Sequence, residues 1–386
     1  MAAKASDVFV DCLQAEGVRY VFGIPGEETL DLNESLADSE IEFVAVRHEQ
    51  GGAYMADMYG RLTGVPGVCL GTLGPGATNL VTGVADAYLD HAPLVALTGQ
   101  GDLERMHKDS HQYIDTVSMF RPITKWNARL QSPAIVPEAV RKAFRVAVAQ
   151  KPGPTHLELP EDVMEAPLDA RPLPVRHDIR RPMPSEAELE RAAELIRDAE
   201  APIVLAGNGL VRVGASQALR EFARVTGIPV AETFMGKGLL DYEDEHFVGT
   251  VGLQSRDYAL AGFEEADLVI TAGFDLVEHA PSHWNPNGDK RIVGVYLTAY
   301  GAFSHTAGTS LTIPITDFAT FYITGYDGSP CTNPPVAATD HPDDPIPDKG
   351  TIVGHFIKYV DRLNTGGGTT PCDANTFGSC VPVMTK

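Results

Sequence analysis

The sequence predicts an α/β protein made of two three-layer domains with mainly parallel sheets, followed by an irregular tail. Short apolar runs alternate with helical patterns over residues 1–165 and again over 185–295, which is typical of helices covering both faces of a parallel sheet. A charged stretch rich in proline, residues 166–184, separates the two parts and is interpreted as an extended linker. The composition then changes abruptly after Val295, so residues 296–386 are treated as an atypical tail.

The size and charge of the chain exclude several classes of protein. At roughly 150 residues per domain, 386 residues correspond to about two and a half domains. Hydrophobic residues at 44% and charged residues at 21% are values of globular proteins and exclude wholesale disorder. The 30 Lys and Arg against 52 Asp and Glu leave a net charge of −22, which would repel nucleic-acid phosphates and anionic membrane surfaces. We expect no nucleic-acid and no membrane partner. Since the N-terminus lacks the pattern of a signal peptide, we also expect a cytoplasmic location.

The first domain is predicted from its caps and its apolar runs. Ser6 is interpreted as the N-cap of a first helix that ends near Gly17. Gly64 can close a helix that starts at His48. Strands are predicted, in chain order, at residues 18–23, 42–46, 68–72 and 93–98. The last of these has apolar residues on both faces, which favours a buried parallel sheet.

The second domain shows the same alternation. Ser185 is predicted to cap a helix over residues 186–199. Strands are predicted at residues 201–207, 228–231, 268–272 and 291–295.

The tail differs from both domains in composition. Glu278 is the last glutamate of the chain, and residues 296–386 contain eight Asp but only four Lys or Arg. Three of the five cysteines lie there, whereas Cys12 and Cys69 lie in apolar surroundings and are predicted to be reduced core residues. We therefore do not expect the tail to continue the α/β fold of the two domains.

Glu49 is the first candidate functional residue. It follows a predicted strand and begins a helix whose first turn contains the small residues Gly51, Gly52 and Ala53. A glutamate in the first turn of any helix is favoured by the helix dipole, so simple capping is one interpretation. In the other, the small residues and a partner surface enclose the carboxyl group, which then shares a proton with a ring nitrogen of a ligand.

Two glycine-rich turns follow neighbouring strands. Residues 71–79 form a strand-to-helix turn that either lets the backbone approach a planar ligand or packs strand against helix. It lacks the Gly-Lys-Ser/Thr ending of a P-loop, so a nucleoside triphosphate site is not predicted. Residues 22–26 form the second turn. Because ligands of α/β proteins bind at the carboxyl ends of strands, we expect these turns and Glu49 to converge on one sheet edge.

Together these motifs resemble the thiamine diphosphate-dependent decarboxylase and synthase family, most closely the acetolactate synthase large subunits. The resemblance is carried by the following segments: 21–26 (VFGIPG), 47–49 (RHE), 60–64 (GRLTG), 74–79 (GPGATN), 109–115 (DSHQYID), 120–125 (FRPITK) and 151–160 (KPGPTHLELP). It identifies residues 1–165 as a pyrimidine-binding domain and residues 185–295 as the family's central domain.

The resemblance also implies roles for individual residues. Glu49 matches the glutamate that hydrogen-bonds N1′ of the cofactor's aminopyrimidine ring, and Gln112 matches a glutamine near the reacting carbon. The cofactor is further expected to be lined by Pro25, Gly26, Thr72, Gly74, Pro75 and Asn79. The implied reaction is the decarboxylation of pyruvate and its condensation with a second 2-oxo acid, in branched-chain amino acid biosynthesis by a homo-oligomer.

Two features bear on substrate and flavin. Glu27 and Glu28 stand where synthases usually carry small residues, and they would disfavour a 2-oxo acid anion if they faced the pocket, so the identity of the acceptor 2-oxo acid is left open.

In the central domain, the glycines at 207, 209 and 214 have a G-x-G-x4-G spacing, which argues against an NAD site. The loops 234–238 and 249–252 resemble loops that contact FAD in flavin-containing synthases, or are turns between domains, so FAD is a candidate cofactor.

The family's third domain has no counterpart in the sequence. That domain supplies a Gly-Asp-Gly motif and a later Asn, which hold Mg²⁺ and the cofactor's diphosphate. The nearest fragment is 326–328 (YDG), so no metal ligands are predicted and Mg²⁺ is expected only from the resemblance. We expect a truncated synthase that is weakly active or inactive alone. The alternative is a non-catalytic partner or regulatory subunit that pairs with a full-length synthase.

Overall fold

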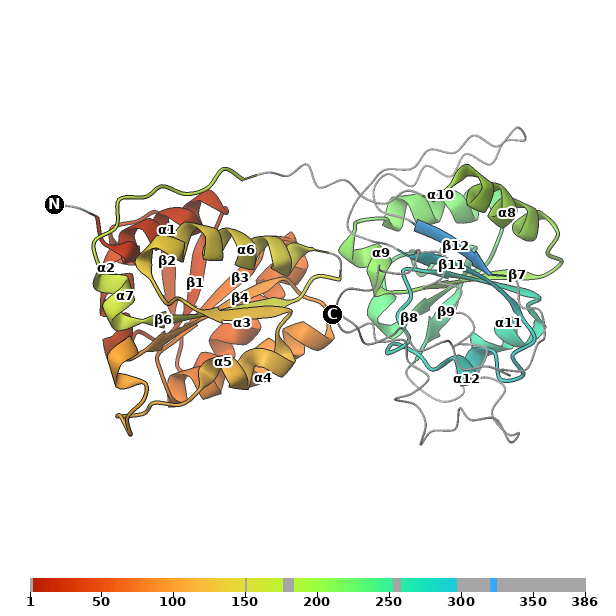
Figure 1. Cartoon of the computed structure of the whole chain (residues 1–386). Helices are drawn as coiled ribbons and strands as arrows, with labels where there is room; N and C mark the ends of the chain where they lie inside the picture. The colour runs from red at the N-terminus through yellow and green to blue at the C-terminus, as the bar shows by residue number, and fades with distance from the viewer. Residues whose placement is uncertain (1–2, 150, 176–183, 253–257, 297–319, 325–386) are drawn as a thin grey trace, which may run out of the picture. The chain divides into compact units, whose positions relative to one another are not determined.

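The computed structural model describes residues 3–149, 151–175, 184–252, 258–296 and 320–324. The chain divides into two compact units, residues 1–179 and 180–386, and each contains its own six-stranded sheet (Figure 1). The predicted class of two α/β domains with mainly parallel sheets is confirmed.

The sheet of the first unit is parallel throughout, with the order β2-β1-β3-β4-β6-β5. Its strands are β1 Tyr20–Gly23, β2 Glu42–Ala45, β3 Gly67–Gly71, β4 Leu94–Gln100, β5 Trp126–Arg129 and β6 Pro154–Pro160. Every residue of β3, β4 and β6 is buried, as expected for central strands covered on both faces.

Helices cover both faces of this sheet. They are α1 Ala5–Ala15, α2 Leu30–Ala37, α3 Glu49–Thr63, α4 Pro75–Leu89, α5 Thr116–Phe120, α6 Val136–Val148 and α7 Glu161–Glu165. Short 3-10 turns lie at Glu27–Thr29, Leu103–Arg105, Arg121–Ile123 and Pro133–Ile135. Val68 and Leu70 of β3 pack in the core below α1 and α6, whereas Cys69 packs with Ala53 and Leu80 of α3 and α4 (Figure 1). This alternation is the two-residue period of a strand buried on two faces.

The first helix begins earlier than predicted, and Ser6 is not its N-cap. The N-cap is Lys4, whose backbone N–H donates to Asp7 Oδ2 at 2.8 Å. Ser6 is buried inside α1, where its hydroxyl oxygen accepts a hydrogen bond from Ser35 of α2 at 2.9 Å. The prediction was wrong because a serine hydroxyl also serves to join two packed helices, which local sequence does not reveal. The closure of α3 by Gly64 is confirmed, with a left-handed φ of 73°.

The second unit has the strand order β12-β11-β10-β7-β8-β9, with β12 antiparallel to β11 and the other pairs parallel. Its strands are β7 Pro202–Ala206, β8 Val230–Thr233, β9 Phe247–Val251, β10 Leu268–Ala272, β11 Arg291–Tyr296 and β12 Thr320–Thr324. Its helices are α8 Glu186–Arg197, α9 Asn208–Arg212, α10 Ser216–Thr226, α11 Leu260–Glu265 and α12 Pro281–Trp284, with a 3-10 turn at Phe234–Gly236. The strands β9 and β12 were not predicted, and neither were β5 and β6 of the first unit.

The core of the second unit also has two layers. Val204 and Ile270 pack with α8, α9 and α10 on one face, and Ile203 and Val269 pack with α11 and α12 on the other. The predicted Ser185 cap is confirmed: Ser185 Oγ accepts from the backbone N–H of Glu188 at 3.2 Å.

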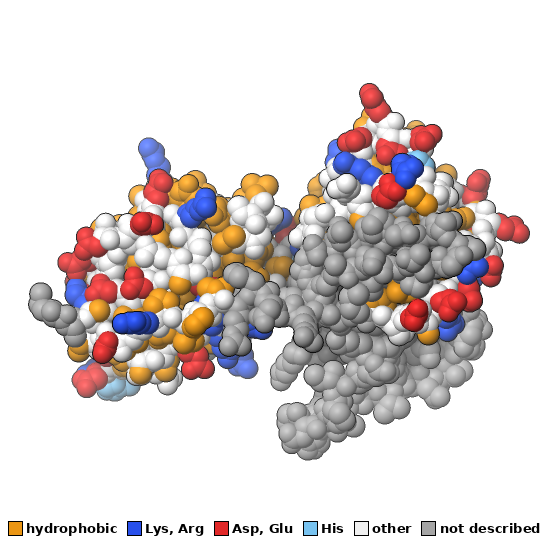
Figure 2. Space-filling view, turned by 90° about the horizontal axis from the view of Figure 1, so that it is seen from above, with side chains coloured by type: hydrophobic (Ala, Val, Ile, Leu, Met, Phe, Trp, Pro, Cys, Tyr) orange, Lys and Arg blue, Asp and Glu red, His pale blue; other side chains and the backbone are white. Residues whose placement is uncertain are grey.

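The predicted tail lies outside the described residues except for Tyr296 and β12. Cys331, Cys372 and Cys380 also lie outside them. Cys12 and Cys69 are buried free thiols, as predicted. No helix in the described part of the chain is long and apolar enough to cross a bilayer. Figure 2 shows acidic side chains on the visible surface of both units, with Lys and Arg among them, in line with the net charge of −22.

Candidate functional site

Apart from Gln112, which lies on the loop after β4, the predicted site residues of the first unit come from segments that follow β1, β2 and β3. These strands are neighbours and parallel, so their carboxyl ends share one edge of the sheet. Gly26 lies directly against Thr72 there, since a Cβ atom added at Gly26 would be 2.4 Å from Thr72 Cβ. Any side chain at residue 26 would therefore displace the turn after β3.

Glu49 is the first residue of α3 and only 7% exposed. The capping hydrogen bond of this helix is made by His48, whose Nδ1 accepts from the backbone N–H of Gln50 at 3.2 Å. Glu49 instead reaches across to α4, where its Oε2 accepts from Asn79 Nδ2 at 2.9 Å. Glu49 therefore makes a hydrogen bond between α3 and α4 and does not make the capping bond of α3.

Gly76, in the first turn of α4, lies close to the other carboxylate oxygen of Glu49. A Cβ atom at this position would lie 3.4 Å from Glu49 Oε1 and 2.8 Å from Thr72 Cγ2. Gly76 belongs to the predicted glycine-rich turn, but its role beside Glu49 was missed. Only the packing of α4 against α3 reveals it. Glu49, Thr72 and Gly76 thus lie so close together that a side chain at residue 76 would not fit without a shift of Thr72.

Gln112 lies against the same turn. A Cβ atom at Gly74 would be 2.5 Å from the carbonyl oxygen of Gln112 and 2.9 Å from its Cβ. Gln112 itself has a φ of 54°, which is uncommon for a residue with a side chain and occurs often at functional sites. Pro25 and Pro75 both have exposed side chains, and Pro75 is the first residue of α4.

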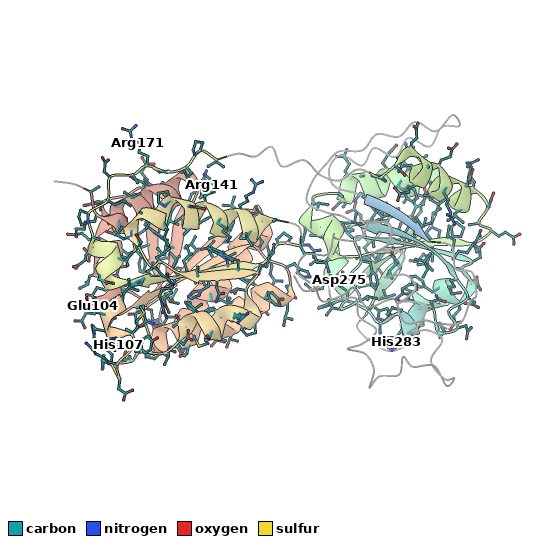
Figure 3. The ribbon with its side chains drawn as sticks, in the orientation of Figure 1. Glu104, His107, Arg141, Arg171, Asp275 and His283 are labelled. Carbon is teal, nitrogen blue, oxygen red and sulfur yellow. The ribbon has the colours of Figure 1, made fainter. Side chains whose placement is uncertain are left out.

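The loop after β4, which carries Gln112, is anchored by buried polar groups (Figure 3 labels Glu104 and His107 on this loop). Gln100 Nε2 donates to the carbonyl oxygen of Ile114 at 3.1 Å and to Glu158 Oε2 at 3.2 Å. Glu158 is fully buried and also accepts from Thr116 and Arg129. This carboxylate is surrounded by donors of its own chain, so it holds the loop in place.

Glu28 also lies at the site, as its position in the sequence suggested. Thr72 Oγ1 donates to Glu28 Oε2 at 2.8 Å, whereas Glu27 is exposed. Burial raises the pKa of the nearby Glu161, and the negative charges of Asp102 and Glu28 raise it further. This edge of the sheet is therefore acidic.

Charged groups join α3 to α4 and so hold Glu49 opposite Asn79. Arg61 of α3 donates to Asp57 of its own helix at 2.9 Å, to Asp86 of α4 at 2.9 Å and to Asp90, directly after α4, at 2.6 Å. Burial raises the pKa of Asp57, and Arg61 partly offsets that rise.

Within the described ranges, no group of three or more His, Cys, Asp or Glu side chains could hold a metal ion, and the fragment 326–328 lies outside those ranges. In the second unit, a Cβ atom at Gly252 would be 3.8 Å from Phe234 Cβ, so the two segments proposed for FAD lie together. The segment 249–252 is not a loop as predicted, because residues 249–251 belong to β9.

Comparison with known proteins agrees with the motifs. Residues 3–119 match the thiamine pyrophosphate enzyme, N-terminal TPP binding domain, and residues 189–300 match the thiamine pyrophosphate enzyme, central domain. The chain is 39% identical over 276 residues to a probable acetolactate synthase large subunit of Methanocaldococcus jannaschii, over 70% of this chain and 47% of that protein. It is 37% identical over 292 residues to an acetolactate synthase of Bacillus subtilis, over 75% of this chain and 51% of that protein. It is 36% identical to a chloroplastic acetolactate synthase of Arabidopsis thaliana, over 70% of this chain and 41% of that protein.

The chain spans about half the length of these relatives, or less. The two matched regions lie one in each unit and together cover more than half of the chain. The chain therefore belongs to the thiamine pyrophosphate enzyme family and carries the N-terminal TPP-binding domain and the central domain of that family.

Proposed function

We propose that this chain takes part in acetolactate formation as a thiamine diphosphate enzyme, in which pyruvate is decarboxylated and condensed with a second 2-oxo acid. The observation that carries the proposal is the buried Glu49, which Asn79 holds beside Gly76. The names of the relatives, acetolactate synthases at 36–39% identity, support the same reaction.

The residues of the first unit would act mainly by holding and orienting the pyrimidine half of the cofactor. Asn79 fixes Oε2 of Glu49, which leaves Oε1 to share a proton with N1′ of the aminopyrimidine ring. Gly26, Thr72 and Gly74 would border the ring with backbone and small side chains, and Gln112 would stand near the substrate. When bound, thiamine diphosphate supplies the electron sink that makes decarboxylation of a 2-oxo acid accessible.

The diphosphate and Mg²⁺ would need partners beyond the described residues. Glu28, Asp102 and Glu161 make the nearby sheet edge acidic, and like charges repel the diphosphate. We therefore propose that another domain or another subunit supplies the Mg²⁺ site, and that the chain alone binds the cofactor weakly and has little activity.

A second candidate function is that of a partner subunit, which the outer face of α3 favours. Met55, Met58 and Leu62 follow one another at helical spacing and are 48%, 48% and 79% exposed, and Leu89 at the end of α4 is 64% exposed. An apolar stripe of this kind is typical of a surface that packs against another helix. A second copy of the chain or a full-length synthase subunit would cover it.

One experiment tests both functions. Acetolactate formation from pyruvate, with thiamine diphosphate and Mg²⁺, is measured for the chain alone, for a full-length synthase alone and for their mixture. We expect little product from the chain alone and a change in rate in the mixture. Glu49→Gln should abolish the change if the chain contributes a catalytic site, and Leu62→Asp should abolish it if the chain acts only through binding.

The outcomes separate the proposals. Substantial acetolactate from the chain alone, or micromolar binding of thiamine diphosphate by calorimetry, would contradict the weak-activity proposal but not the family. A mixture indistinguishable from the full-length synthase, with no co-purification, would contradict the partner function.

A further inference from the structure

The turn between β7 and α9 is closed by a carboxylate of its own chain. Gly207 lies in this turn and Gly209 follows in α9, and these are the two glycines that resemble a dinucleotide-binding motif. Glu278 accepts hydrogen bonds from the backbone N–H of Asn208 at 3.0 Å and from the backbone N–H of Asp275 at 2.9 Å (Asp275 is labelled in Figure 3). The hydroxyl of Thr233 donates to the same carboxylate. Donors from three separate segments therefore converge on one anionic group.

The two glycines allow the loop after β10, residues 273–278, to approach the turn in the place of a ligand. A Cβ atom at Gly207 would lie 2.6 Å from the carbonyl oxygen of Gly273 and 2.8 Å from Glu278 Oε1. The backbone N–H of Gly209 donates to the carbonyl oxygen of Gly273 at 2.8 Å. In dinucleotide sites the same kind of close approach serves the ligand's diphosphate.

We propose that Glu278 takes the place of a ligand phosphate at this turn, and that the central unit consequently binds neither NAD nor FAD through Gly207 and Gly209. The hydrogen-bond donors that would recognise a diphosphate are already engaged by the carboxylate. A diphosphate brought beside a partly buried carboxylate would also be repelled by it. The residues at this turn thus do not fit a dinucleotide. This proposal stands independently of the activity of the first unit.

The test uses the full chain and two matched variants. The chain is titrated with FAD and with NAD, and binding is followed by calorimetry. We expect no saturable binding at the turn. Hydrogen exchange of the backbone amides of Asn208 and Asp275 should therefore be the same with and without FAD or NAD. In Glu278→Ala the donors lose their partner, so the melting temperature of the second unit, reported by Trp284 in a Trp126→Phe background, should fall by roughly 4–10 °C.

Added inorganic phosphate or sulfate should then restore part of that loss in Glu278→Ala, because the anion can occupy the vacated position. The same salts should raise the melting temperature less in Glu278→Gln, which keeps the side-chain volume. They should raise it least in the unchanged chain. Saturable binding of FAD or NAD that protects the Asn208 amide in the unchanged chain would overturn the proposal. So would a Glu278→Ala variant with an unaltered melting temperature. If Glu278→Ala does not fold, the dinucleotide titration of the unchanged chain decides alone.

Discussion

Asn79 on α4 donates a hydrogen bond to Glu49 on α3 across 2.9 Å, and this contact links the first turns of two helices that begin at the same edge of the sheet. The bond fixes one oxygen of the buried carboxyl group, and the other oxygen lies beside Gly76. The chemistry proposed for the first unit depends on this pair and on the charged groups that hold the two helices together.

Asn79→Ala should lower the free energy of unfolding of the first unit by about 1–2 kcal/mol, because a buried carboxylate loses a hydrogen bond. Urea unfolding is followed by Trp126 in a Trp284→Phe background, since each unit holds one of the two tryptophans. A double-mutant cycle with Glu49→Gln should give a coupling energy of about 1 kcal/mol. Thr82→Ala, at an exposed position of α4, is the control and should change little. Additive effects of Asn79→Ala and Glu49→Gln would contradict the pairing.

Gly76→Ala should also destabilise the first unit, because the added methyl group would lie 2.8 Å from Thr72 Cγ2. We expect a loss of about 1–2 kcal/mol from overpacking, reduced by the better helix propensity of alanine. Thr72→Ser removes that methyl group and keeps the hydroxyl bonded to Glu28, so it should restore most of the stability. Urea unfolding of the single and double variants measures this. If Thr72→Ser fails to rescue Gly76→Ala, the contact is not the cause.

Arg61→Met should destabilise the first unit by about 3 kcal/mol at pH 7, because Asp57, only 1% exposed, is left without its counter-charge. Removal of Arg61 raises the pKa of Asp57 further, so the ionised carboxylate is penalised above that pKa. The loss should therefore shrink as the pH falls from 7 towards 4. Arg224→Met breaks an exposed pair with Glu221 and should cost little at either pH. A loss independent of pH would contradict this account.

His156 should make the first unit sensitive to acid. Burial lowers the pKa of this fully buried ring to about 3, and its Nε2 lies 2.8 Å from Thr98 Oγ1. The folded pKa is below the ordinary value of about 6.5, so the contribution is fully present above pH 6.5 and is lost as the pH falls towards 3. The unchanged chain should lose on the order of 4 kcal/mol relative to His156→Gln over that range. His107→Gln, at an exposed position, should leave the profile unchanged. Parallel profiles for the unchanged chain and His156→Gln would refute the prediction.

Local sequence determined most elements because their signals act between close neighbours. The Gly64 and Ser185 caps, the strand Leu268–Ala272 and the position of Glu49 at a helix start were all predicted from short patterns. The family resemblance, carried by ordered motifs, was confirmed by the two domain matches. The roles assigned to Glu49, Gln112 and the cofactor-lining residues remain predictions.

Tertiary structure decided which groups meet. Ser6 looks like a cap in sequence but joins α1 to α2, and Gly207 looks like part of a nucleotide-binding turn but receives Glu278, 71 residues later. The partner of Glu49, 30 residues away, is likewise set by the packing of α4 on α3. Caps and periodicity depend on backbone geometry within one or two turns, whereas these contacts depend on strand order and on close helix packing. The sequence by itself therefore determined most of the elements and the family, and the fold alone decided that one glycine turn lies beside the buried carboxyl group of Glu49 while the other is closed by Glu278.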